Sequence, residues 1–302
     1  MKKMILFLFF LGIGHGLLAG EKKITTSDGV QLYVKVKGSG TPLLYVHGGP
    51  GSASLWFEEL FGDFMEKHFT VVYLDQRGVG RSASPADDNY SLARLALDFE
   101  EVKKELGFES WLTLGHSFGG VLQMGYAELY PQSHKGMIMV NCTIDINDSS
   151  CNSWIPKAAE LVGEKYIGCD KDTVPMSQRL NEYGGKLREV NEFYKMGSRS
   201  PKAFARLDEI SAAIPNFNYD FGNYALQNQD YWRNFKPLTA EMEMPVLYFY
   251  GTTDYLVGPE HYKGIDFPNL LLWENKGGHI PFIEDKDDLE RAILAYVEKY
   301  NL

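Results

Sequence analysis

The sequence is poor in cysteine and in positive charge. Three of its 302 residues are cysteines, and 30 Lys and Arg stand against 40 Asp and Glu, a formal net charge of -10. No cysteine has zinc-like spacing, and the excess of negative charge argues against nucleic acid or an anionic membrane as a partner. The 44% hydrophobic content is enough to bury a large core, as one domain or as a domain with an insertion.

The sequence begins with an apolar run that is too short to span a bilayer comfortably. Lys2 and Lys3 precede the run at residues 4–13, and small residues follow up to Gly20. This pattern predicts a secretory signal peptide over residues 1–20, with an N-terminal membrane anchor as the alternative. We therefore expect an exported protein, periplasmic or secreted, without stable membrane insertion after signal removal.

Export would place the three cysteines in an oxidising compartment. Cys142 ends an apolar strand run and is expected to be a small buried core residue. Cys151 and Cys169 lie in one later segment, and the sequence leaves open whether they form a disulfide.

The stretch from Trp111 to Gly120 organises the rest of the chain. An apolar run of β-forming residues ends at Gly115, a helical pattern begins at Phe118, and Ser117 stands on the turn between them. This arrangement is a nucleophile elbow, which exposes the Ser117 hydroxyl and leaves the Phe118 N–H free to bind an oxyanion. The sequence therefore predicts Ser117 as a nucleophile.

Strands alternate with helices on both sides of this elbow. After a hairpin over residues 23–37, apolar strands are expected at 42–46, 70–74, 136–140, 245–250 and 270–273, with helices at 55–67, 92–106, 118–130 and 289–300. This order predicts an α/β fold with a mostly parallel central sheet and helices on both faces, whose active edge lies at the carboxyl ends of the strands.

Two glycine-rich loops follow strands at that edge. His47-Gly48-Gly49-Pro50-Gly51 offers a second oxyanion donor, for which we choose the Gly49 N–H, with Gly48 as second choice. In the loop from Asp75 to Ser82, Asp75 and the arginines 77 and 81 are expected to pair with each other and with backbone carbonyls. These two loops and the elbow together resemble the α/β-hydrolase superfamily and, within it, the prolyl aminopeptidase (proline iminopeptidase) family.

Two residues beyond the elbow complete a catalytic triad in the chain order of that superfamily. Asp254 follows the strand at 245–250, and His279 follows the last strand. Neutral His279 would take the Ser117 proton, and Asp254 would orient the imidazole. Asp266 is a rival for the acid, but it lacks the preceding strand and glycine. No metal or cofactor is required.

The segment 145–238 has helical stretches and no comparable strand, so we expect a helical cap inserted after the sixth main strand. It divides the hydrolase core into residues 21–144 and 239–302. The cap is rich in aromatic residues, most of which are expected to form its own small core. The resemblance implies that cap acids hold a substrate's amino terminus, and the candidates are Glu189, Glu192, Asp208, Glu209 and Asp220, of which we choose Glu209.

The leading functional hypothesis is an aminopeptidase that releases N-terminal proline or another small apolar residue. Some family members carry an acid directly after the catalytic aspartate, whereas this chain has Tyr255. A carboxylesterase or lactonase with the same Ser117, His279 and Asp254 is the alternative, and a catalytically silent binding protein is a third reading. The expected partner is a small peptide or a small acyl compound.

Overall fold

The computed structural model describes residues 20–302, so the predicted signal peptide lies outside the described residues except for Gly20, where the first strand begins. The described residues form one eight-stranded sheet in the order β1-β2-β4-β3-β5-β6-β7-β8. The strands are β1 (Gly20–Thr25), β2 (Gln31–Gly38), β3 (Thr41–Val46), β4 (Phe69–Leu74), β5 (Trp111–His116), β6 (His134–Val140), β7 (Val246–Gly251) and β8 (Leu270–Asn275).

The sheet is antiparallel at one edge and parallel elsewhere. β1 pairs with β2 and β2 with β4 in antiparallel register, whereas every pairing from β4 through β3 to β8 is parallel. The inner parallel strands β5 and β7 are buried along their whole length, which agrees with their mostly apolar sequences, whereas the edge strand β8 is partly exposed. The predicted mostly parallel sheet is confirmed.

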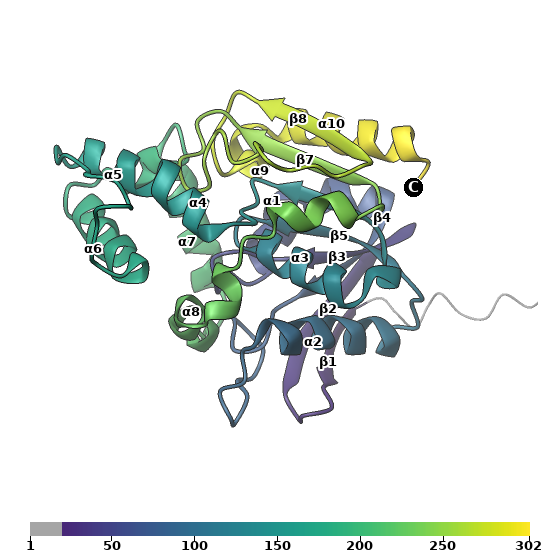
Figure 1. Cartoon of the computed structure of the whole chain (residues 1–302). Coiled ribbons are helices and arrows are strands. Elements are labelled where there is room, and N and C mark those ends of the chain that lie inside the picture. Colours follow the sequence, from purple (N-terminus) through teal and green to yellow (C-terminus); the bar gives the residue numbers. More distant parts are fainter. Residues whose placement is uncertain (1–19) are drawn as a thin grey trace, which may run out of the picture.

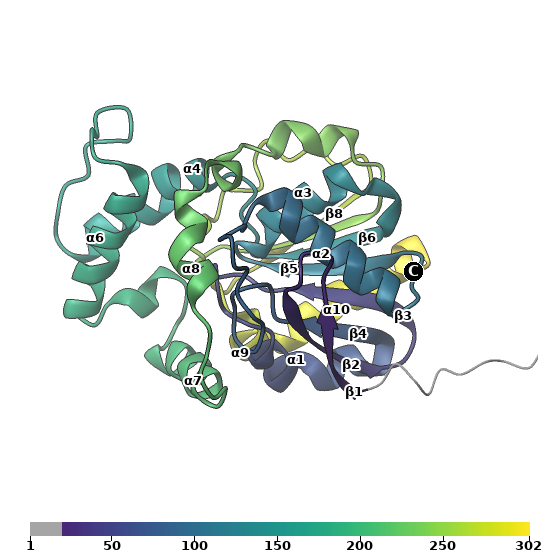
Figure 2. The ribbon, with the colours of Figure 1, turned by 90° about the horizontal axis from the view of Figure 1, so that it is seen from below.

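Helices cover both faces of the sheet (Figures 1 and 2). The helices that flank it are α1 (Leu55–His68), α9 (Pro281–Glu284) and α10 (Lys286–Tyr300) on one face, and α2 (Leu92–Glu105) and α3 (Gly119–Leu129) on the other, with the short turn η2 (Pro131–Ser133) after α3. Within residues 20–302, no helix has the length and apolar character needed to cross a membrane.

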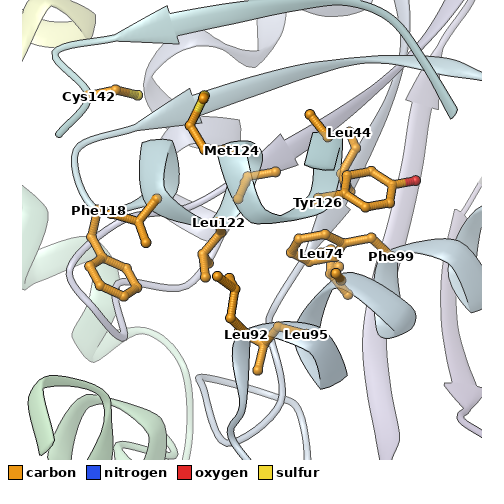
Figure 3. Packing of buried hydrophobic residues seen from close by; sticks show 14 of the residues in the cluster. Leu44, Leu74, Leu92, Leu95, Phe99, Phe118, Leu122, Met124, Tyr126 and Cys142 are labelled. Carbon is orange, nitrogen blue, oxygen red and sulfur yellow. The ribbon is translucent and has the colours of Figure 1, made fainter. Parts of the chain in front are cut away.

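The core has two halves because side chains alternate along each strand. Leu44 and Leu74 face α2 and α3, whereas their neighbours Leu43 and Tyr73 face α1 and α10. Figure 3 shows the first half, where side chains of α3 such as Leu122 pack between α2 and the sheet. Cys142 is buried there as a free thiol, as the sequence predicts.

The chain leaves the sheet after β6 and returns at β7, and most of the helices between them, such as α5 and α6, project from one end of the sheet (Figure 1). These elements are α4 (Ile146–Ser149), η3 (Ser150–Trp154), α5 (Ile155–Leu161), α6 (Met176–Glu189), η4 (Phe193–Met196), α7 (Pro201–Ala212), α8 (Asp220–Tyr224), η5 (Ala225–Gln227), η6 (Gln229–Trp232) and η7 (Lys236–Glu241). Helices therefore occupy the segment 145–238 in which the sequence predicts a cap, and we call these elements the cap.

The cap has a core of its own, but fewer of its aromatic residues belong to that core than the sequence predicts. α5, α6 and η4 enclose a cluster that includes Tyr183 and Leu187. Phe221 and Tyr231 instead pack edge-on against Phe118 in the core beneath the cap. A disulfide joins Cys151 and Cys169. This bond ties η3 to the loop before α6.

Candidate active site

The elbow has the geometry expected of a nucleophile turn. Ser117 stands between β5 and α3 with φ at +57°, a left-handed conformation that a non-glycine residue adopts at a cost of about 1–3 kcal/mol. The turn is tight, and a Cβ atom on Gly119 would collide with the carbonyl oxygen of Val46. Position 119, two residues after Ser117, therefore has to be a glycine because β3 approaches so closely.

Asp254 and His279 meet at the carboxyl ends of β7 and β8. Asp254 Oδ1 accepts the N–H groups of Leu256 and Val257 at 3.0 and 3.2 Å, and Asp254 Oδ2 lies 2.8 Å from His279 Nδ1. Both side chains are buried. The rival Asp266 has no contact with His279 in the described chain, and its N–H donates to Thr239. The pairing expected from the sequence is the one that the structure contains.

Ser117 and His279 line the same cavity, which has a volume of about 400 Å³. When His279 Nδ1 donates to Asp254, Nε2 carries no proton and is free to accept one. Neither Ser117 Oγ nor His279 Nε2 is hydrogen-bonded to any residue in the range 20–302. Both atoms are therefore available to a ligand in the cavity.

Three contacts outside the predicted site fix the His279 loop. The His279 N–H donates to the Gly197 carbonyl at 2.6 Å, and His116 Nε2 lies 2.9 Å from the His279 carbonyl oxygen. Asn141 donates to the Gly278 carbonyl and accepts the Gly251 N–H, both at 2.8 Å. Sequence reasoning missed these residues because their partners lie more than 80 positions away.

His116 is neutral in this position. Burial, and then the neighbouring charge of His279, hold the pKa of His116 well below its usual value. A neutral ring can donate one hydrogen bond from Nε2 to the His279 carbonyl without adding a positive charge beside the His279 imidazole. His116 is therefore a positioning group for the loop of His279.

The two predicted oxyanion donors both face the cavity. Gly49 and Phe118 line it, and neither backbone N–H is hydrogen-bonded within residues 20–302. Gly49 has φ at +111°, a conformation that L side chains rarely adopt. Gly48, the second choice, does not line the cavity and lies behind Ser117. The structure therefore favours Gly49.

The loop at residues 75–82 is held by ion pairs, but not all of those predicted. Arg81 Nε lies 2.7 Å from Asp75 Oδ2, as expected. Burial raises the pKa of Asp75, but the hydrogen bonds and charge of Arg81 outweigh that effect and keep the pKa below its usual value. Arg77 instead forms a bidentate pair with Asp98 at 2.6 and 2.8 Å and a second pair with Asp28. The prediction that Arg77 belongs to the Asp75 network is wrong.

The cavity is mostly apolar. Its lining residues are Gly49, Pro50, Ser52, Trp56, His116, Ser117, Phe118, Thr143, Ile146, Ser149, Ser150, Trp154, Leu180, Asn181, Gly184, Arg188, Phe193, Phe204, Leu207, Leu226, Leu256, Val257, His279 and Ile280. No carboxylate is among them in the described chain. None of the five cap acids considered above reaches the cavity.

The expectation that Glu209 binds an amine is corrected by its position. The Glu209 side chain is 67% exposed and pairs with Arg206 on the outer face of α7. Phe204 and Leu207 of the same helix face the cavity. A spacing of three and four residues between the apolar positions of α7 places Glu209 away from them.

Within residues 20–302, no cluster of three or more His, Cys, Asp or Glu could hold a metal ion.

Comparisons with known proteins agree with this fold. A family model described as "alpha/beta hydrolase fold" matches residues 41–162. The proline iminopeptidase of Neisseria meningitidis is 37% identical over 113 residues, which cover 36% of this chain and 36% of that protein. The matched part thus spans about a third of the length of that relative.

Solved structures extend the likeness to nearly the whole chain. A proline iminopeptidase-related protein of Thermus thermophilus has a TM-score of 0.75 at 22% identity, covering 92% of this chain and 97% of that one. An esterase of Exiguobacterium antarcticum has a TM-score of 0.67 at 17% identity, covering 91% and 98%. The chain is an α/β-hydrolase-fold protein that resembles prolyl aminopeptidases (proline iminopeptidases).

Proposed function

We propose that this protein is a serine hydrolase that works through an acyl-enzyme. The hydrogen bond between Asp254 and His279, in the wall of the cavity that also contains Ser117, carries the proposal. His279 takes the Ser117 proton as Oγ attacks a carbonyl carbon, and the Gly49 and Phe118 N–H groups stabilise the oxyanion. His279 then protonates the leaving group, and water releases the acyl group from Ser117 by the same steps.

The chemistry of the cavity supports a carboxylic ester or lactone as substrate. A buried ammonium needs a negative partner, and no carboxylate lines the cavity in the part of the chain that the structure describes. Trp154, Phe193 and Phe204 offer an apolar surface to an acyl chain. An uncharged acyl group fits this lining better than a free amino terminus does.

Release of an N-terminal proline or another small apolar residue is the second candidate. It is favoured by the similarity to the proline iminopeptidase of Neisseria meningitidis. The matched part is about a third of the chain, and the cap residues that would bind an amine are not identified. The two candidates share Ser117, His279 and Asp254 and differ in what the cavity accepts.

We also propose that the mature protein is exported. The charged and apolar pattern of residues 1–20 supports export, and so does the disulfide between Cys151 and Cys169, because such bonds persist in oxidising compartments.

A substrate panel separates the two candidates. Proline amide, its N-acetyl derivative and short-chain 4-nitrophenyl esters are compared, with Ser117→Ala as the blank. An esterase hydrolyses the esters and neither amide well, whereas an aminopeptidase hydrolyses proline amide and loses most of that activity on acetylation. Equal rates for wild type and Ser117→Ala on every compound would contradict the proposal itself.

A further inference from the structure

One face of α6 forms part of the cavity wall. Asn181, Gly184 and Arg188 are spaced by three and four residues, which places them on the same side of the helix, and all three line the cavity. Tyr183 and Leu187 are buried in the core of the cap on the adjacent face. The core of the cap therefore fixes the side of α6 that carries Arg188.

Among the described residues that line the cavity there is no Asp, Glu or Lys, and Arg188 is the one arginine. Its guanidinium lies 5.2 Å from the centre of the Phe193 ring, and a Cβ atom on Gly184 would lie 3.5 Å from Arg188 Nη1. The guanidinium therefore lies close to the helix at Gly184. The contacts of Arg188 are with an aromatic ring and a glycine and not with a counter-ion.

No carboxylate of residues 20–302 forms an ion pair with Arg188, and this sets it apart from other arginines of the cap. Arg179 pairs with Asp172 at 2.6 Å and with Glu182 at 2.7 Å. Arg206 pairs with Glu209 at 3.2 Å. The arginine that faces the cavity thus keeps its donors free for another anion.

A guanidinium matches a carboxylate in shape, because its planar fork donates two parallel hydrogen bonds to the two oxygens. Arg188 is exposed to solvent and also lines the cavity, with the Phe193 ring packed beside its guanidinium, so an anion in the cavity can reach its donors. The same unpaired positive charge opposes a substrate ammonium in the cavity.

We propose that Arg188 binds a carboxylate carried by the substrate of Ser117. The substrate class is then a monoester or amide with a free carboxylate at its far end. This inference rests on the proposed function for the position of the reacting carbonyl. The carboxylate could belong to the acyl part or to the leaving part, and the experiment has an arm for each.

Matched neutral and anionic esters test the proposal. In the acyl arm, 4-nitrophenyl hydrogen adipate is compared with 4-nitrophenyl hexanoate. In the leaving-group arm, the butyrate ester of 4-hydroxybenzoate is compared with that of 4-hydroxybenzamide. We expect the wild type to prefer the carboxylate in one arm by about tenfold in kcat/KM, mainly through KM.

The variants identify the group responsible. Arg188→Gln brings the ratio of kcat/KM for the anionic ester to kcat/KM for its neutral partner close to one, and Arg188→Lys retains part of that ratio because the charge stays but the fork is lost. Arg206→Gln is the matched control, since Arg206 is an exposed cap arginine away from the cavity, and it should keep the full preference.

Binding without turnover separates this inference from the proposed function. Adipate should raise the melting temperature of Ser117→Ala and should not raise that of Ser117→Ala with Arg188→Gln. If both proteins respond equally, or if Arg188→Gln keeps the ester preference, the inference is overturned. Loss of turnover on every ester with adipate binding intact would contradict the proposed function and support the anion site.

Discussion

The sheet side and the cap side of the cavity differ in whether their charged side chains are paired. On the sheet side of the described chain, the Asp254 carboxylate is hydrogen-bonded to His279, and Asp75 forms an ion pair with Arg81. On the cap side Arg188 faces the cavity without a counter-ion in the described chain. Paired charges hold a fixed geometry, whereas an unpaired one is available to a ligand. Changes on the sheet side should therefore affect kcat or stability, and changes on the cap side should affect KM.

The largest expected effect comes from the acid behind His279. Asp254→Asn removes the acceptor that orients the ring and stabilises the imidazolium, so kcat should fall by about 10⁴-fold with little change in KM. Steady-state kinetics on a neutral ester measure this change. Asp266→Asn is the matched control because Asp266 does not contact His279, and a comparable loss there would contradict the assignment of the acid.

Breaking a buried pair of the sheet side should unfold the protein more easily. Arg77 is fully buried, and Arg77→Met would leave the buried Asp98 without its bidentate partner and with Arg94 as its remaining ion pair. The free energy of unfolding should fall by about 3 kcal/mol, the lower end of the cost of breaking a buried pair, as measured by urea denaturation.

The exposed pair of Arg206 and Glu209 provides the comparison. Arg206→Ala should change the free energy of unfolding by about 0–1 kcal/mol. A larger loss for Arg206→Ala than for Arg77→Met would contradict the contrast between buried and exposed pairs.

A smaller effect depends on pH. His47 is fully buried, and burial lowers its pKa to about 4 from the usual 6.5. Between these values the unfolded chain binds the proton and the folded one does not, so stability falls as the pH drops from 6.5 to 4. His47 accounts for a loss of about 3 kcal/mol in the free energy of unfolding over this pH range.

The pH dependence is tested by replacing the titrating ring. His47→Gln should flatten the plot of unfolding free energy against pH in this window relative to the wild type. His68, which is exposed, is the control, and His68→Gln should leave the slope as it is. Identical slopes for wild type and His47→Gln would contradict the assignment.

The sheet side could be predicted from sequence because its signals are local. Glycines two residues before and after Ser117 indicate the turn, and Asp254 and His279 each follow a short apolar strand. Parallel strands end at one edge, so topology alone brings these residues together.

What sequence reasoning missed depends on contacts between distant segments. The partners of Arg77 lie at Asp98 and Asp28, and their selection needs the packed loop and helix. In the cap, the spacing of the apolar residues of α7 indicates that Glu209 faces outward, so this position could have been predicted from the sequence. In α6 the spacing of Tyr183 and Leu187 indicates the buried face, but that the adjacent face with Arg188 lines the cavity follows from tertiary packing.

The central claim is that Ser117 is a nucleophile activated by His279. Treatment with a fluorophosphonate probe, followed by intact-mass and peptide mass spectrometry, tests it most directly. We predict one adduct, on Ser117, that forms rapidly in the wild type, slowly in His279→Ala and not at all in Ser117→Ala. An unmodified wild-type protein, or an adduct that persists in Ser117→Ala, would contradict the account.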